Sequence, residues 1–327
     1  MYPLNRNRRL RSSSAIRDLV RENTLSNNDF IVPLFVVEGK NIKKEIFSMP
    51  DYYQLSLDLL HEEVKELWSI GLKAVLIFAK VDDDLKDNKG TEALNKNGLM
   101  QRAIKTIKNS EPEMLVITDV ALDPYSSFGH DGVVENSKIL NDPTLDILSE
   151  MAVSHAAAGA NFVAPSDMMD GRVLKIRKAL EQENFVETGI ISYGVKYASS
   201  FYGPFRNALD SAPGFGDKKT YQMDFANAKE AVNEVIRDIG EGADIIMVKP
   251  GITYLDILCS ISSKVNCPIA AYQVSGEYTM LKTAAEKGFL DFNKVMIEQL
   301  YAFKRAGASM IVTYHAKDVV KLLNQVK

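Results

Sequence analysis

The sequence predicts one closed (β/α)8 barrel, the TIM-barrel form of an α/β protein. Short runs rich in Val and Ile alternate with longer stretches of helical periodicity, and this alternation occurs eight times. No linker and no change in composition divides the 327 residues. Apolar runs of this kind are typical of parallel strands buried on both faces, so eight of them favour a single barrel.

The expected strands and helices follow one another along the whole chain. We expect strands at 30–36, 73–78, 114–122, 161–165, 189–196, 245–250, 268–275 and 309–314. The clearest helical patterns lie at 55–70, 143–158, 224–240, 254–264 and 292–306. Two Rossmann-like domains are the structural alternative, but residues 35–40 read FVVEGK after the first strand and lack the GxGxxG phosphate motif.

Residues 1–28 lack barrel-like patterning. Five arginines lie between residues 6 and 17, and no acidic residue precedes Asp18. This composition superficially resembles a transit peptide, which stays open as an alternative, but it lacks the apolar core of a secretory signal. We expect residues 1–28 to form an N-terminal arm for subunit contacts and residues 29–327 to form the catalytic barrel.

The composition argues against several classes of function. With 39 Lys and Arg against 43 Asp and Glu, the net charge is −4, which gives no general attraction to nucleic acid or anionic membranes. The longest apolar runs, such as 74–79, are far shorter than the roughly 18 residues that span a bilayer. We expect a cytoplasmic protein without nucleic-acid or membrane partners. Cys259 and Cys267 lack metal-binding spacing, and we expect reduced thiols packed in the core.

Polar residues at the carboxyl ends of the expected strands are the candidates for catalysis, because barrel enzymes place their chemistry there. Asp119 lies near the end of the third strand. The fifth to eighth strands end at Lys196, Lys249, Ser275 and Tyr314.

Two of these residues are lysines on adjacent strands. The Cα atoms of Lys196 and Lys249 should lie about 5 Å apart. A single lysine here is more often a rim side chain, but two buried ammonium groups disfavour each other's protonation. A neutral amine near pH 7 can attack a carbonyl and form a Schiff base. Lys80 also ends a strand, but residues 82–84 are all aspartate, so we expect it to be solvated, charge-compensated and without a catalytic role.

Four long segments resemble the porphobilinogen synthase family, whose members are also called 5-aminolaevulinate dehydratases. They are APSDMMDGRV at 164–173, KYASSFYGPFRNA at 196–208, MVKPG at 247–251 and AYQVSGEY at 271–278. The resemblance covers most of the chain, in the expected order. It implies a lyase that condenses two molecules of 5-aminolaevulinate asymmetrically, with loss of two waters, to porphobilinogen for tetrapyrrole (haem) biosynthesis.

The resemblance also implies roles for individual residues. Lys249 would hold the substrate that supplies the propionate side of the product, and Lys196 the one that supplies the acetate side. Both would do so as Schiff bases, and an imine makes the neighbouring carbon acidic. Asp119 matches the family's active-site carboxylate, for which proton transfer is a fair role.

Two substrate carboxylates need anchors, and the family pattern supplies them. Ser275 and Tyr314 would bind one carboxylate, while Arg206 and Lys218 would bind the other. Gln222 would lie on the same lid as Lys218, where the polar residues 211–220, with Gly214 and Gly216, have the composition of a mobile loop. Ordinary surface charge is the alternative for Lys218.

The loop after the third strand departs from the zinc-binding members of the family. Those members carry three cysteines where this sequence has Ala121, Asp123 and Asp131, so no catalytic zinc is expected. The segment resembles the aspartate-rich class, which uses Mg²⁺ or no active-site metal. Asp123 and Asp131 could hold an ion, stabilise imines or transfer protons. His130 makes a transition-metal site conceivable, but a lone loop histidine is usually solvated.

A second metal position is implied by Glu234, which matches an allosteric Mg²⁺ ligand of the magnesium-responsive members. Glu230 and Glu241 accompany it, and a solvated acidic helix face is the alternative. The family forms homo-octamers whose N-terminal arms wrap neighbouring barrels, so we expect a homo-octamer.

Two other functions are the alternatives for a barrel of this kind. A class I aldolase acting on a sugar phosphate needs only one lysine, and TYHAKD at 313–318 lacks the glycine-rich turn expected of a phosphate site. A barrel kept only as an assembly scaffold would normally have lost catalytic residues, yet both lysines are present, as are Arg206, Ser275 and Tyr314.

Overall fold

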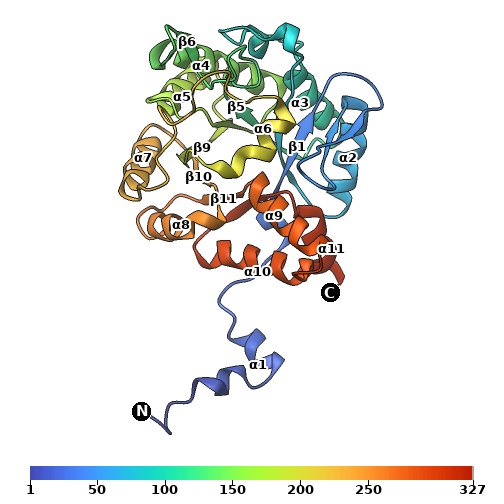
Figure 1. The fold of residues 1–327 in the computed structure, drawn as a ribbon, viewed down its shortest axis with the longest axis vertical. Helices are drawn as coiled ribbons and strands as arrows, with labels where there is room; N and C mark the ends of the chain where they lie inside the picture. The colour runs from blue at the N-terminus through green and yellow to red at the C-terminus, as the bar shows by residue number, and fades with distance from the viewer. Residues whose placement is uncertain (326–327) are drawn as a thin grey trace.

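The chain forms a closed barrel of eight parallel strands surrounded by helices (Figure 1). The computed structural model describes residues 1–325. The barrel strands are β1 (Phe30–Val36), β4 (Ala74–Ala79), β5 (Leu115–Val120), β8 (Phe162–Pro165), β9 (Gly189–Lys196), β10 (Ile245–Lys249), β11 (Ile269–Gln273) and β12 (Met310–Thr313). Parallel pairing of β12 with β1 closes the barrel, with Phe30 opposite Ile311. The predicted (β/α)8 barrel is confirmed, and each expected strand has its counterpart.

Helices follow the strands and cover the outside of the barrel. They are α2 (Leu57–Ser69), α3 (Leu99–Ser110), α4 (Asn141–Ala158), α5 (Arg172–Gln182), α6 (Gly203–Leu209), α7 (Lys229–Gly240), α8 (Leu255–Ser262), α9 (Ser275–Glu286), α10 (Phe292–Arg305) and α11 (Ala316–Gln325). Two small additions were not expected from the sequence. The pair β2 (Lys43–Glu45) and β3 (Tyr53–Leu55) extends the sheet beside β1, and β6 (Val133–Glu135) with β7 (Lys138–Leu140) forms a separate hairpin.

The core has two layers because alternate strand side chains point to opposite faces. One layer fills the barrel interior and is rich in aromatic rings, such as Phe35 stacked on Phe78 at 5.6 Å between centroids. The other lies between the strands and the helices. There α2 contributes Leu60, Val64 and Leu67, which share one face of the helix.

The N-terminal segment lies apart from the barrel. It contains a short 3-10 helix, η1 (Asn7–Arg11), and α1 (Ser14–Leu19), and neither has a buried residue. Figure 1 shows this segment extending away from the barrel. Among the described residues, no helix has the length and apolar character needed to cross a membrane.

Two details of the sequence-based prediction are wrong. The seventh barrel strand ends at Gln273 and not at Ser275, because Ser275 begins helix α9. The thiols are not both packed in the core: Cys259 is exposed, whereas Cys267 is half-buried and packs against the edge of the core.

Candidate active site

Lys196 and Lys249 lie directly opposite each other at the carboxyl ends of β9 and β10. Their exposed fractions are only 6% and 4%. Parallel pairing of neighbouring strands brings these two residues together although 53 positions separate them in the sequence. The barrel therefore places two buried amines side by side at its carboxyl end.

A β-bulge in β9 turns Lys196 toward the barrel interior. Between the pairs Ser192–Ile246 and Val195–Val248, β9 contains one residue more than β10. Ile191 before this bulge and Tyr193 within it belong to the interior layer, whereas Val195 after it belongs to the outer layer. Strict alternation from Tyr193 would point Lys196 outward. The extra residue reverses this orientation and places both amines in the same interior space.

Aromatic rings surround the amine of Lys249. Its Nζ lies 4.6 Å from the ring centre of Tyr272, 4.9 Å from that of Phe205, 5.0 Å from that of Tyr193 and 5.3 Å from that of Tyr202. Burial, followed by the charge of Lys196, lowers the pKa of Lys249 from 10.5 to about 7. A substantial neutral fraction is therefore present near pH 7, as a nucleophilic amine requires.

Within residues 1–325, Lys196 has a hydrogen-bond acceptor for its amine and Lys249 has none. The Nζ of Lys196 donates to the backbone carbonyl of Ser166, which follows β8. Asp119 of β5 lies in the same interior space, and its Oδ1 has no hydrogen-bond partner within residues 1–325. Burial, and then the charge of Asp123, raises the pKa of Asp119 to about 7. This carboxyl can therefore both donate and accept a proton near neutral pH.

Lys218 closes the site from the segment between α6 and α7. Its Nζ lies 3.1 Å from Oδ2 of Asp123 and 3.0 Å from Oδ2 of Asp131, and all three side chains are buried. Burial lowers the pKa of Lys218, but the two carboxylates outweigh it, and the net direction is upward. The ammonium group is therefore charged and occupies the space between the two aspartates.

The pKa values of the two aspartates shift in opposite directions in this environment. Burial raises the pKa of Asp123 more than Lys218 lowers it. For Asp131, burial acts in the same direction, but the lysine charges and the hydrogen bonds outweigh it, and its pKa is lowered. Asp131 is therefore the more strongly ionised member of the pair.

His130 is buried, contrary to the expectation of a solvated loop histidine. Its Nδ1 lies 3.0 Å from the hydroxyl of Tyr221, and its Nε2 lies 3.0 Å from the carbonyl oxygen of Phe215. The segment that carries Lys218 folds over the loop after β5, which removes His130 from water. Both ring nitrogens therefore take part in contacts between these two segments.

The remaining candidate anchors lie around the same opening. Ser275 is buried, and its Oγ accepts a hydrogen bond from the backbone N–H of Phe205 at 2.9 Å. The hydroxyl of Tyr314 lies 3.0 Å from that of Tyr272. Arg206 is half-buried on α6. Gln222 is buried, with its Oε1 unpartnered within residues 1–325.

Lys80 follows β4, which ends one residue earlier at Ala79, and its ion pair is different from the expected one. It pairs with Asp210 at the end of α6 rather than with the aspartates at 82–84. The chain brings Asp210 across the barrel opening, and no local pattern reveals this contact.

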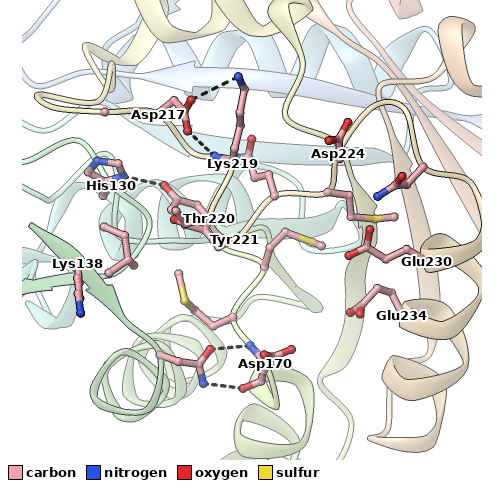
Figure 2. A pocket seen from close by; sticks show the side chains of 18 of the residues that line it. His130, Lys138, Asp170, Asp217, Lys219, Thr220, Tyr221, Asp224, Glu230 and Glu234 are labelled. Atoms are coloured by element: carbon pink, nitrogen blue, oxygen red, sulfur yellow. Dashed lines mark hydrogen bonds and ion pairs between the residues drawn. The ribbon is translucent and has the colours of Figure 1, made fainter.

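Glu234 lies outside the barrel opening, on α7. Its carboxylate is 3.1 Å from the guanidinium of Arg237. It lines a cavity of about 930 Å³ between α7 and the Lys218 segment, and Figure 2 shows Glu230 and Glu234 on one side of it, with His130 and Lys138 on the other. The two candidate catalytic lysines do not line this cavity.

Comparison with known proteins identifies the family. The family model described as delta-aminolevulinic acid dehydratase matches residues 4–322. The chain belongs to the delta-aminolevulinic acid dehydratase family. This is the family that the sequence resembles, and the predicted enzyme class, a dehydratase among the lyases, is confirmed.

Relatives in this family match along the whole chain. The delta-aminolevulinic acid dehydratase of Synechococcus elongatus is 49% identical over 327 residues, covering 99% of this chain and 100% of the relative. That of Bacillus subtilis is 50% identical and covers 98% of each. A crystal structure of the Toxoplasma gondii delta-aminolevulinic acid dehydratase (porphobilinogen synthase), in complex with the product porphobilinogen, has a TM-score of 0.96 and 50% identity. It covers 97% of this chain and 91% of that one.

Sequence reasoning missed the side chains that shape the lysine environment of this dehydratase family member. Tyr193 and Tyr272 face the interior beside Lys249, and Ser166 supplies the acceptor for Lys196. Tyr272 could have been found, since it follows the strand alternation inward from Ala270. The orientation of Tyr193 relative to Lys196 could not, because it depends on the bulge.

Proposed function

We propose that the chain catalyses the condensation of two 5-aminolaevulinate molecules to porphobilinogen, with release of two waters, through Schiff bases on Lys249 and Lys196. The observation that carries this proposal is the directly opposed, buried lysine pair, in which Lys249 has a pKa of about 7. Family membership and the product-bound relative support the substrate and the product.

The first covalent step uses the neutral amine of Lys249. Its Nζ attacks the ketone carbon of one substrate, a proton moves to the carbonyl oxygen, and water leaves as the C=N bond forms. Asp119 has a pKa of about 7 and lies in the same space, so it can supply and recover these protons. The aromatic rings around Lys249 help to bury its amine, and this burial, together with the charge of Lys196, favours the neutral form.

Lys196 holds the second substrate as an imine in the same way. Loss of a proton from the carbon beside one imine gives an enamine, and its carbon attacks the imine carbon of the other substrate. The C–C bond forms as that C=N π bond breaks, and the nitrogen takes the electron pair and becomes an amine. Lys196 must first release the carbonyl of Ser166, to which its ammonium donates. The different partners of the two lysines favour reaction at Lys249 first.

Carboxylate anchors orient the two substrates. The hydroxyls of Ser275 and Tyr314 bind the carboxylate of the substrate on Lys249, and Arg206 with Lys218 binds the other. Lys218 now lies between Asp123 and Asp131, so binding of the second carboxylate requires it to move. We infer that closure of residues 211–220 over substrate includes this movement, with Gln222 on the same lid.

Magnesium is proposed at Glu234 as an allosteric ion and not as a catalytic one. A carboxylate oxygen suits Mg²⁺, and the cavity beside Glu234 has room for the hydrated ion. Asp123 and Asp131 supply oxygen ligands too, but Lys218 already compensates their charge. Within residues 1–325, no cluster of three or more Asp, Glu, His or Cys side chains has the spacing of a metal site. An ion bound between Asp123 and Asp131 would supply positive charge in place of Lys218.

The assembly proposed for the chain is a cytoplasmic homo-octamer. Residues 1–28 form an arm that packs on a neighbouring barrel, and residues 29–327 form the catalytic unit. Exposed apolar side chains on the arm, including Leu4, Leu10 and Leu19, support this because they have no partner within the described chain.

The decisive experiment incubates purified protein with 5-aminolaevulinate and measures porphobilinogen with a colour reagent, with and without Mg²⁺. Borohydride is then added, and peptide mass mapping locates reduced substrate adducts. We expect product formation and adducts on Lys249 and Lys196. Product without an adduct on either lysine would contradict the Schiff-base mechanism, while absence of product under all conditions would contradict the function.

A further inference from the structure

A buried ion pair lies behind the strand that carries Lys196. Arg172 of α5 is 2% exposed and Asp238 of α7 is 1% exposed. The guanidinium Nη2 lies 3.1 Å from Oδ2 of Asp238. Two charges are withdrawn from water here, at a position outside the barrel interior, and the reaction described above does not use them.

The pair holds the bulged part of β9. Nη2 of Arg172 donates to Oγ of Ser192 at 3.2 Å and to the carbonyl oxygen of Tyr193 at 3.3 Å. Ser192 in turn donates to Oδ2 of Asp238. A Cβ atom on Gly194 would lie 3.2 Å from the same oxygen, so glycine leaves room for the carboxylate. These contacts fall on the residues where β9 gains its extra position.

The same guanidinium also contacts the turn after β8. Its Nη1 donates to the carbonyl oxygen of Met169 at 3.3 Å, and its Nε lies 3.8 Å from Oδ2 of Asp167. Asp167 directly follows Ser166, whose carbonyl oxygen accepts a hydrogen bond from Nζ of Lys196. Arg172 thus connects the strand that carries Lys196 to the turn whose Ser166 carbonyl accepts the hydrogen bond from Lys196.

We infer that Arg172 is a positioning residue for Lys196, acting through the β9 bulge, and that it has no comparable effect on Lys249. Without the guanidinium, the Tyr193 carbonyl loses a buried donor and the Asp238 carboxylate keeps only the Ser192 hydroxyl and has no cation beside it, so the bulge loses the contact that fixes it. Lys196 depends on the bulge for its inward direction. Lys249 lies on the regular strand β10, and its backbone carbonyl accepts hydrogen bonds from Tyr197 N–H and the Tyr202 hydroxyl.

This inference rests on the proposed function only in taking Lys196 as an imine-forming residue. The test therefore measures each lysine separately. Wild type, Arg172→Met and the milder Ser192→Ala are treated with 5-aminolaevulinate and borohydride, and adducts on both lysines are quantified by mass spectrometry. A displacement of about 1 Å can reduce reaction by up to about 100-fold, so we expect the Lys196:Lys249 adduct ratio to fall at least about tenfold in Arg172→Met. Ser192→Ala should shift it in the same direction by less.

Arg177→Met is the matched control. Arg177 lies on the same helix and pairs with Asp244 at 2.7 Å, but it contacts the other end of β9 through the carbonyl of Thr188. Its loss should lower stability and leave the adduct ratio within about twofold of wild type. An unchanged ratio in both Arg172→Met and Ser192→Ala, or the same fall in Arg177→Met, would overturn the inference.

A second readout separates this inference from the proposed function. Reductive methylation with formaldehyde and cyanoborohydride modifies lysines without any substrate. If wild type forms no 5-aminolaevulinate adduct, the Schiff-base mechanism fails, but the relative methylation rates of Lys196 and Lys249 still report the position of Lys196. We expect that relative rate to change in Arg172→Met and Ser192→Ala. A ratio equal to that of wild type in both variants would contradict the positioning role.

Discussion

Lys196 and Lys249 form a directly opposed pair across β9 and β10, and only Lys196 has a hydrogen-bond acceptor for its amine within the described residues. Burial and the charge of Lys196 lower the pKa of Lys249 to about 7. The pair is therefore asymmetric before substrate binds. This asymmetry predicts which lysine reacts first and how the reaction depends on pH.

Replacement of Lys249 by alanine should abolish the reaction. Removing the nucleophile removes the covalent route, so we expect the turnover to fall by about three orders of magnitude or more. Lys80→Ala is the control, because Lys80 directly follows a barrel strand at the same opening but pairs with Asp210. Steady-state assays of both variants test this. Comparable losses in the two variants would argue against a special role for Lys249.

The pH dependence of imine formation at Lys249 should change when Lys196 is replaced. An amine is reactive when neutral, so adduct formation on Lys249 should increase as the pH rises through about 7. In Lys196→Met the neighbouring positive charge is absent, the pKa of Lys249 rises, and the midpoint moves to higher pH. Borohydride trapping between pH 5 and 9 measures the midpoint. A midpoint that stays unchanged or moves downward would show that Lys196 does not lower the pKa of Lys249.

Loss of the Lys218 ammonium should loosen the lid. In Lys218→Met, two buried carboxylates face each other without a cation, which costs about 3–5 kcal/mol if the lid stays closed. We expect protease cleavage within residues 211–220 to be at least about tenfold faster, and Mg²⁺ to reduce it by binding the two aspartates. Lys219→Met is the control, since Lys219 is exposed and pairs with Asp217. Equal cleavage rates in the two variants would exclude the ion pair as the lid contact.

Burial of His315 should destabilise the fold at acidic pH. Burial, and then Lys282, lowers its pKa from 6.5 to about 3. Below pH 6.5 the unfolded chain binds a proton that the folded chain does not, so this contribution to stability is lost as the pH falls toward 3. His315 packs between Tyr278 and Phe292, which makes His315→Phe a conservative replacement.

Urea unfolding of wild type and His315→Phe at pH 8 and pH 5 isolates this effect. Buried carboxyls such as Asp119 titrate in both proteins, so they cancel in the comparison. From pH 8 to pH 5 the free energy of unfolding should shift in favour of the variant by about 2 kcal/mol. A difference that does not change with pH would show that His315 takes up its proton in the folded state.

Magnesium should act through Glu234 on assembly. If Mg²⁺ at Glu234 stabilises one quaternary state, a coupling of about 1–3 kcal/mol raises activity by up to roughly two orders of magnitude. Glu234→Ala should remove this activation and favour a smaller oligomer, with imine trapping at Lys249 intact. Removal of residues 1–11 should have the same effect by weakening arm contacts.

Light scattering and activity assays across Mg²⁺ concentrations measure both effects of Glu234→Ala. Glu230→Ala is the control from the same helix and the same cavity. A full response to Mg²⁺ with unchanged mass in Glu234→Ala would exclude the allosteric assignment and leave Asp123 and Asp131 as the metal candidates.

The barrel strands were predictable one by one along the chain, because each is identified by a pattern within its own segment. Runs of Val and Ile bounded by polar residues identify strands buried on both faces wherever they occur. The end of the seventh strand was misplaced at Ser275 because apolar residues occur as far as Val274, with only Gln273 between them. The strand stops earlier because Ser275 begins α9 and accepts a hydrogen bond from Phe205, a residue 70 positions away.

The sequence by itself determined the barrel, the family and the position of both lysines at the carboxyl ends of adjacent strands. Tertiary structure decided how those lysines differ: the bulge that turns Lys196 inward, the Ser166 carbonyl that receives its amine, and the aromatic rings around Lys249. It also decided that Lys218 pairs with two aspartates. Local periodicity depends on near neighbours in the chain, whereas these contacts join segments that only the closed barrel brings together. Burial in the closed barrel then shifts the pKa values of the side chains at these contacts.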